Sequence, residues 1–136
     1  MRLLSFVARI AMEVPVIELL KGYRSNVVAL YAVGHVTQKN YEKVFVPAIE
    51  SALARHDKIR LYYQIGPDFC GIDPGAFWAD ARVGFENLPR LERNAVVTDV
   101  EWIRLSMMAF GLLMPGQARV FSLADAHAGR KWIAGA

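Results

Sequence analysis

The sequence lacks most of the residues and motifs that identify a particular chemistry. It has one cysteine, Cys70, so it cannot form a disulfide framework or a cysteine-based zinc site. No GxGxxG, GxxxxGKS or GxxxxGKT occurs, so the common glycine-rich loops that bind nucleotide phosphates are absent. A GxSxG nucleophile elbow is also absent. These absences argue against the common nucleotide-binding and hydrolase classes, and we expect a protein that is not an enzyme.

Long runs of one kind of side chain are missing as well. The net charge is +3 and the charges are interspersed, so we expect no nucleic-acid partner. No segment reaches the roughly 18–20 apolar residues that a membrane-spanning helix needs. His35, His56 and His127 are scattered, and none has another ligand at the spacing of a zinc site. We therefore predict no metal and no cofactor.

The amino end resembles a short signal peptide without completing one. Arg9 interrupts its apolar part, and no small-residue cleavage site follows before Glu13. We interpret residues 1–12 as an N-terminal extension, since Met12 could itself be a start, and residues 13–136 as a single domain. A lone cysteine suits a reducing compartment, so we expect a cytoplasmic protein, with peripheral membrane contact as a further expectation.

Apolar runs and helical stripes alternate along the rest of the chain. The runs predict strands at 14–20, 27–34, 58–66, 93–99 and 118–123. The stripes predict helices at about 38–55, 76–87, 101–113 and 123–135. The order β-β-α-β-α-β-α-β-α is typical of an α/β fold with a largely parallel sheet. A short turn joins the first two strands, so we expect them to be antiparallel and the five-stranded sheet to be mixed.

Several polar residues and prolines predict where the helices begin and bend. Thr37 is an N-cap candidate for the helix at 38–55, and Pro47 should kink that helix or split off its first turns. Asp73 followed by Pro74 is a typical helix start. Thr98 or Asp99 is expected to cap the helix at 101–113.

The helix at 101–113 is apolar around nearly its whole circumference. Ile103, Met107, Phe110 and Met114 form one stripe, which a sheet can bury. Six further apolar residues spill onto its flanks: Trp102, Leu105, Met108, Ala109, Leu112 and Leu113. They are explained by a wide core face that packs against Phe77, Trp78 and Phe85, by a ligand pocket, by a membrane contact or by a dimer patch. The sequence leaves these alternatives open.

Three stretches give the chain a resemblance to a known family. IELLKGYRSNVVALYAVGHVTQKNYEKVFVPAIE, FWAD and RNAVVTDVEW resemble the SpoIIAA-like proteins, small bacterial domains related to STAS domains and to CRAL-TRIO lipid carriers. The resemblance covers roughly residues 16–134 and implies a five-stranded mixed sheet with four helices. Asn94 departs from the basic or apolar residue that usually precedes AVV in the family. Pro74 and Gly75 stand where a STAS phosphorylation switch would carry serine, so no such switch is expected.

These observations lead to one hypothesis about function and one rival. We expect a non-enzymatic domain that binds a small apolar ligand or lipid and associates peripherally with membranes. The rival is a STAS-type regulatory module that docks a partner protein, and a homodimer fits either. Arg104, Arg119, Arg130 and Lys131 would favour anionic headgroups if they share one side with the apolar helix. The expected ligand-binding or membrane-binding residues are Phe77, Trp78, Trp102, Met107, Met108, Phe110, Leu112, Leu113 and Met114.

Overall fold

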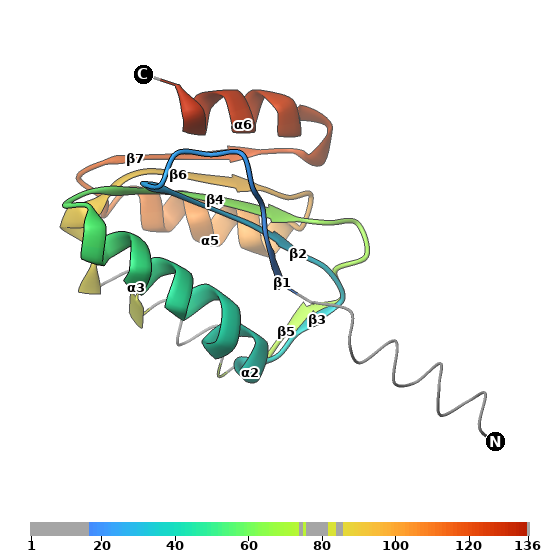
Figure 1. Cartoon of the computed structure of the whole chain (residues 1–136). Helices are drawn as coiled ribbons and strands as arrows, with labels where there is room; N and C mark the ends of the chain where they lie inside the picture. Colours follow the sequence, from blue (N-terminus) through green and yellow to red (C-terminus); the bar gives the residue numbers. More distant parts are fainter. Residues whose placement is uncertain (1–16, 74, 76–81, 84–85, 136) are drawn as a thin grey trace.

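Five strands form one mixed sheet in the order β1-β2-β4-β6-β7 (Figure 1). The computed structural model describes residues 17–73, 75, 82–83 and 86–135, to which all structural statements below refer. The strands are β1 (Ile17–Leu19), β2 (Val27–Ala32), β4 (Ile59–Ile65), β6 (Leu91–Val97) and β7 (Gln117–Phe121). β1 runs antiparallel to β2, and the other pairs are parallel. The predicted five-stranded mixed α/β sheet and its opening hairpin are therefore confirmed.

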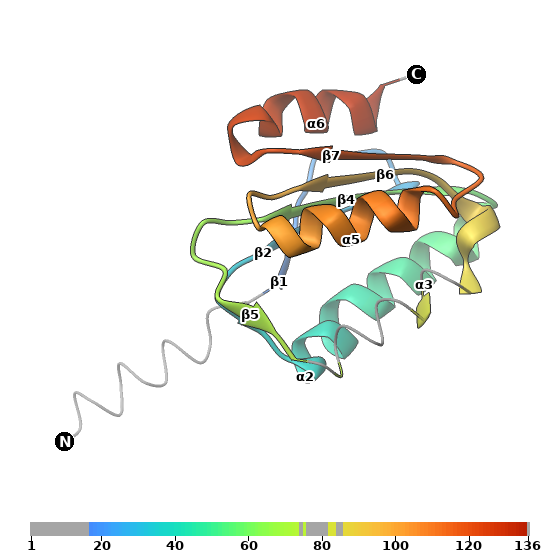
Figure 2. The same ribbon diagram turned by 180° about the vertical axis from the view of Figure 1, so that it is seen from behind.

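Helices cover both faces of this sheet. α3 (Val46–Arg55) and α5 (Glu101–Gly111) lie on one face, and α6 (Ala126–Ala134) lies on the other (Figures 1 and 2). The central strands are apolar on both sides because both sides are covered. In β4, for example, Leu61 packs into the core beneath α3 and α5, whereas its neighbour Tyr62 packs into the core beneath α6. The sheet thus separates two hydrophobic cores.

The helix predicted at 38–55 is interrupted by one wide turn. The Thr37 side chain accepts a hydrogen bond from the Asn40 backbone, so it caps α2 (Gln38–Asn40) as expected. A π-helical turn follows at Tyr41–Phe45, where the Val46 N–H reaches back to the Tyr41 carbonyl, and α3 then begins. Pro47 lies in the first turn of α3 and has no N–H to donate. The predicted separation of the first turns is confirmed, and a wide turn accommodates the proline.

A second, very small sheet lies at the end of the main one. β3 (His35–Val36) pairs in parallel with β5 (Gly71–Ile72), within a stretch that the sequence predicts only as loop. Gly71 has a φ of 156°, and a Cβ there would come within 3.0 Å of the His35 ring. A glycine is therefore needed where these two segments meet.

The predicted cap of the helix at 101–113 was wrong, because Val100 precedes α5 and no side chain caps it. The cap predicted at Asp73 belongs to a helix whose first turn lies outside the described residues, and one Asp73 oxygen accepts a hydrogen bond from the Gln38 N–H at the start of α2. Asp99 accepts a hydrogen bond from the Leu123 N–H, which begins the short 3-10 turn at Leu123–Asp125 before α6. Thr98 bonds to the Val100 N–H, and Val100 is the residue that precedes α5.

Three main helices are described. Most of the fourth, predicted at 76–87, lies outside the described residues, as does the extension at 1–12.

Candidate functional site

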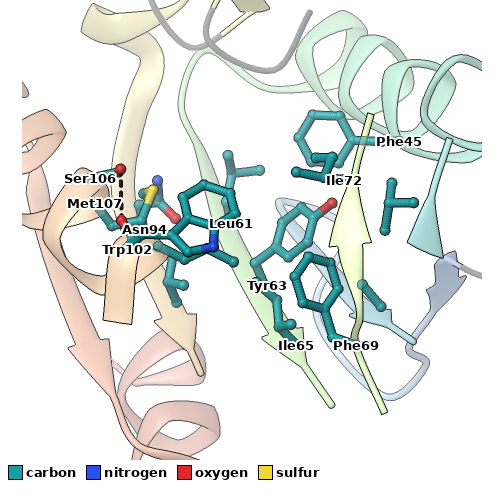
Figure 3. Close-up of a pocket in the computed structure, with 14 residues that line it drawn as sticks. Phe45, Leu61, Tyr63, Ile65, Phe69, Ile72, Asn94, Trp102, Ser106 and Met107 are labelled. Carbon is teal, nitrogen blue, oxygen red and sulfur yellow. Dashed lines mark hydrogen bonds between the residues drawn. The ribbon is translucent and has the colours of Figure 1, made fainter. Parts of the chain in front are cut away.

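An apolar cavity of about 100 Å³ lies between the sheet and α5 (Figure 3). β2, β4 and β6 form its floor, and α5 forms one wall through Trp102, Ile103 and Met107. The small β3–β5 sheet and the loop before it form the opposite side through Val36, Ile72 and Phe69. The cavity is therefore built where the main sheet, the small sheet and α5 meet.

The lining is mostly hydrocarbon and aromatic. Phe45, Tyr63, Phe69 and Trp102 supply rings, as Figure 3 shows. No Asp, Glu, His, Lys, Arg or Cys side chain is among the described residues of the wall. Its polar side-chain groups belong to Tyr63, Asn94, Trp102 and Ser106, and the Ser106 hydroxyl already donates to the Trp102 carbonyl at 2.8 Å. Such a surface suits an apolar ligand better than an ionised one.

α5 divides its apolar residues between the interior and solvent. Ile103 and Phe110 are half-buried against the core, and Met114, just after the helix, is buried. This is the inward stripe that the sequence predicted. On the outer side, Leu112 is 88% exposed and Leu113 is 58% exposed. Leu105, Met108 and Trp102 are also exposed, so α5 carries more apolar surface than the sheet buries.

The predicted site residues thus fall into several groups. Trp102 and Met107 line the cavity. Met108 of α5 is exposed, as are Leu112 and Leu113 just after the helix; together with Trp102 and Leu105 they form what we call the outer face of α5. Phe110 and Met114 pack towards the core instead of lining the cavity or the outer face. Phe77 and Trp78 lie outside the described residues.

Sequence reasoning missed the strand residues that complete the cavity. These are mainly Asn94 and Val96 from β6, Leu61, Tyr63 and Ile65 from β4, and Phe69 and Ile72 from the loop and the small sheet. Alternation along β4 and β6 would have grouped the first five on one face of the sheet. No sequence signal marks Phe69 and Ile72, because strands of two residues have no recognisable period.

A histidine–carboxylate pair lies in the small sheet that borders the cavity. His35 Nε2 is 2.5 Å from Asp73 Oδ1. This hydrogen bond, supported by the Gln38 N–H, lowers the pKa of the Asp73 carboxyl. Cys70 is exposed on the adjoining loop, and its thiol makes no hydrogen bond to any described residue. The pair ties β3, β5 and the start of α2 together, which is a sufficient structural role.

Most of the cations that were expected to assist membrane contact lie on the other face of the sheet. Arg119 stacks over the Trp132 ring at 4.9 Å, beneath α6. Arg130 belongs to α6 and donates to Gln64 Oε1 at 3.1 Å. Lys131 also belongs to α6, which Figure 2 shows across the sheet from α5. Only Arg104 is on α5, and it donates to the Thr98 carbonyl at 2.9 Å. The outer face of α5 therefore has no cluster of cations from α6.

The described part of the chain offers neither a cluster of metal ligands nor a membrane-spanning helix. Within it, no group of three His, Cys, Asp or Glu side chains could hold a metal ion. No helix in the same residues is long and apolar enough to cross a membrane.

The sheet order and its two helical layers define a small α/β domain with a SpoIIAA-like fold. A crystal structure of an uncharacterised protein from Shewanella loihica PV-4, described as having this fold, is similar with a TM-score of 0.64. The two chains are 24% identical, and the match covers 86% of this chain and 91% of the other. The chain belongs to the SpoIIAA-like family, whose model matches residues 27–134. No functionally curated protein matches it.

Proposed function

We propose that the protein is a non-enzymatic domain that binds a small apolar ligand or the end of a lipid chain. The observation that carries this proposal is the cavity between the sheet and α5, with its aromatic wall and no charged side chain among the described residues. Trp102 and Ser106 are the exposed members of that wall, so the cavity meets solvent beside them. A ligand would enter along the first two turns of α5.

The expected affinity follows from the apolar surface that a ligand would lose to water. Each buried CH₂ group contributes about 0.8 kcal/mol, so a body of about six carbons gains about 5 kcal/mol. That free energy corresponds to a Kd on the order of 0.1–1 mM. Contact of the outer face of α5 with a membrane would increase the affinity for a lipid, since the lipid could enter the cavity without crossing water.

The experiment is a titration with toluene followed by NMR, with native mass spectrometry of freshly purified protein beside it. We expect saturable shifts at cavity residues such as Ile72 and Met107. Ser106→Phe should abolish them, because its ring would occupy the apolar hollow. The matched control is Ala109→Phe, an exposed position of the same helix that does not line the cavity. No saturable shift and no co-purifying apolar compound would contradict the proposal.

The outer face of α5 favours a second candidate, a STAS-type module that docks a partner protein. Leu105, Met108, Leu112 and Leu113 form an exposed apolar surface of the kind that interaction sites present. A partner that co-purifies in stoichiometric amount, with no lipid in the mass spectrum, would favour this candidate. A second copy of the chain is another occupant of the same face, and light scattering would detect that dimer.

A further inference from the structure

Asn94 is a buried polar side chain without a hydrogen-bond partner among the described residues. It lies in β6, is 6% exposed and belongs to the cavity wall (Figure 3). Its carboxamide neither donates nor accepts a hydrogen bond within the part of the chain that the structure describes. In the described part, every completely enclosed side-chain nitrogen or oxygen does have a partner. The Asn94 amide is therefore accessible from the cavity itself.

An unpaired amide in an apolar wall is costly unless something in the cavity bonds to it. Leaving a buried donor or acceptor unsatisfied costs about 1–3 kcal/mol, so an apolar side chain would be the more stable choice for packing alone. The unpaired amide therefore indicates that this side chain serves a bound group.

The chemistry of the wall indicates what that group is. A carboxamide offers two N–H donors and one acceptor oxygen, so it pairs in both directions with an alcohol or an amide. A carboxylate could use only the donors and would bring an unpaired charge into a wall without cations among its described residues. A neutral polar group is therefore favoured over an ionised one.

The size of the cavity limits the rest of the ligand. A cavity of about 150 Å³ in another protein holds one benzene molecule. The present cavity is about 100 Å³, so it encloses an apolar body of at most about six carbons. Any longer chain must leave through the mouth beside Trp102.

We propose that the cavity recognises a small neutral amphipathic molecule, an alcohol or amide with a short apolar body, through a hydrogen bond to the Asn94 carboxamide. This inference rests on the proposed function and makes it more specific. Asn94 is then the residue that selects the polar group, and Trp102 and Tyr63 contribute aromatic surface to the apolar body.

The first test uses the unmodified protein and three ligands of equal chain length. Titrations with 1-hexanol, hexanamide and hexanoate at pH 7 are followed by NMR shifts of cavity residues. We expect the alcohol and the amide to bind at least tenfold more tightly than hexanoate. Equal or tighter binding of hexanoate would overturn the inference while leaving the proposed function intact. If no ligand binds, including toluene, the proposed function itself fails.

The second test assigns the preference to Asn94. Asn94→Leu keeps the shape of the side chain and should weaken 1-hexanol binding about three- to tenfold, the worth of one net hydrogen bond, while toluene binds as before. Ser122→Ala is the control, because Ser122 does not line the cavity and its hydroxyl donates to Asp125, so this change should leave hexanol binding unchanged. Unchanged hexanol binding in Asn94→Leu would overturn the role of Asn94. The ligand comparison still decides the chemical class if that variant does not fold.

Discussion

Single side chains in this protein show which details a sequence can and cannot predict. The inward stripe of α5 was predicted, because a helix of known period against a sheet leaves little choice of buried side. The position of Asn94 on a β-strand was also predicted, but its lack of a partner was not. Whether a side-chain amide has a hydrogen-bond partner depends on which groups surround it in the folded chain, and the sequence does not give those distances.

Asp73 gives a prediction about pH at the scale of one residue. Its folded-state pKa is lowered from 3.8, first through the hydrogen bond with His35. The carboxylate therefore contributes stability that is fully present above the unfolded pKa and is lost as the pH falls through the lower folded pKa. We expect the stability difference between wild type and Asp73→Asn to shrink as the pH falls from about 6 to about 2, as measured by urea unfolding.

The contribution of His35 can be separated with a double-mutant cycle. In a His35→Phe background, the Asp73→Asn change should show a weaker dependence on pH, because the principal hydrogen-bond partner of Asp73 is gone. The same dependence in both backgrounds would mean that His35 is not the cause.

At the scale of elements, strong patterns predicted well and short ones did not. β2, β4 and β6 have six or seven residues each and contain a run of apolar side chains, which is enough to identify a buried strand. β3 and β5 have two residues each, and their pairing depends on a contact across more than thirty positions of sequence. The cap at Asp99 was misassigned for a related reason. Its carboxylate bonds to the turn before α6 instead of to the helix that follows it in the chain.

The cap at Thr37 gives a prediction for one helix. Its hydroxyl accepts from the Asn40 N–H at 3.1 Å, and the Asn40 side chain bonds back to the Thr37 backbone. Thr37→Ala should lower the free energy of unfolding by about 1 kcal/mol, because the cap is lost. Thr37→Ser keeps the hydroxyl and serves as the control in denaturant titrations. A loss of equal size in both variants would show that the hydroxyl is not what stabilises the helix.

The whole molecule has two chemically different sides. The outer face of α5 is apolar, whereas Arg130 and Lys131 lie with α6 on the opposite side of the sheet. A flat membrane cannot contact both sides at once. If the protein binds membranes through α5, the binding should depend on apolar burial and only weakly on lipid charge.

Vesicle flotation tests this prediction. We expect similar binding to neutral and anionic phospholipid vesicles, and little change with salt. Leu112→Ser should weaken binding roughly tenfold, since burying an exposed leucine gains about 1.5–3 kcal/mol. Lys131→Ser on α6 is the control and should have no effect. Binding that requires anionic lipid and disappears in salt would instead place the contact on the α6 side.

The position of α6 in the chain has a consequence for biosynthesis. Ala29, Tyr62 and Ala95 form one of the two cores with Ile133, which belongs to this last helix. Arg60 and Arg93, on two of the strands, both donate to carbonyls at the end of α6. During translation, all five strands leave the ribosome before the element that shields one side of them. A nascent chain, or one that stops before α6, would therefore present bare aromatic and aliphatic surface to chaperones and proteases until α6 arrives.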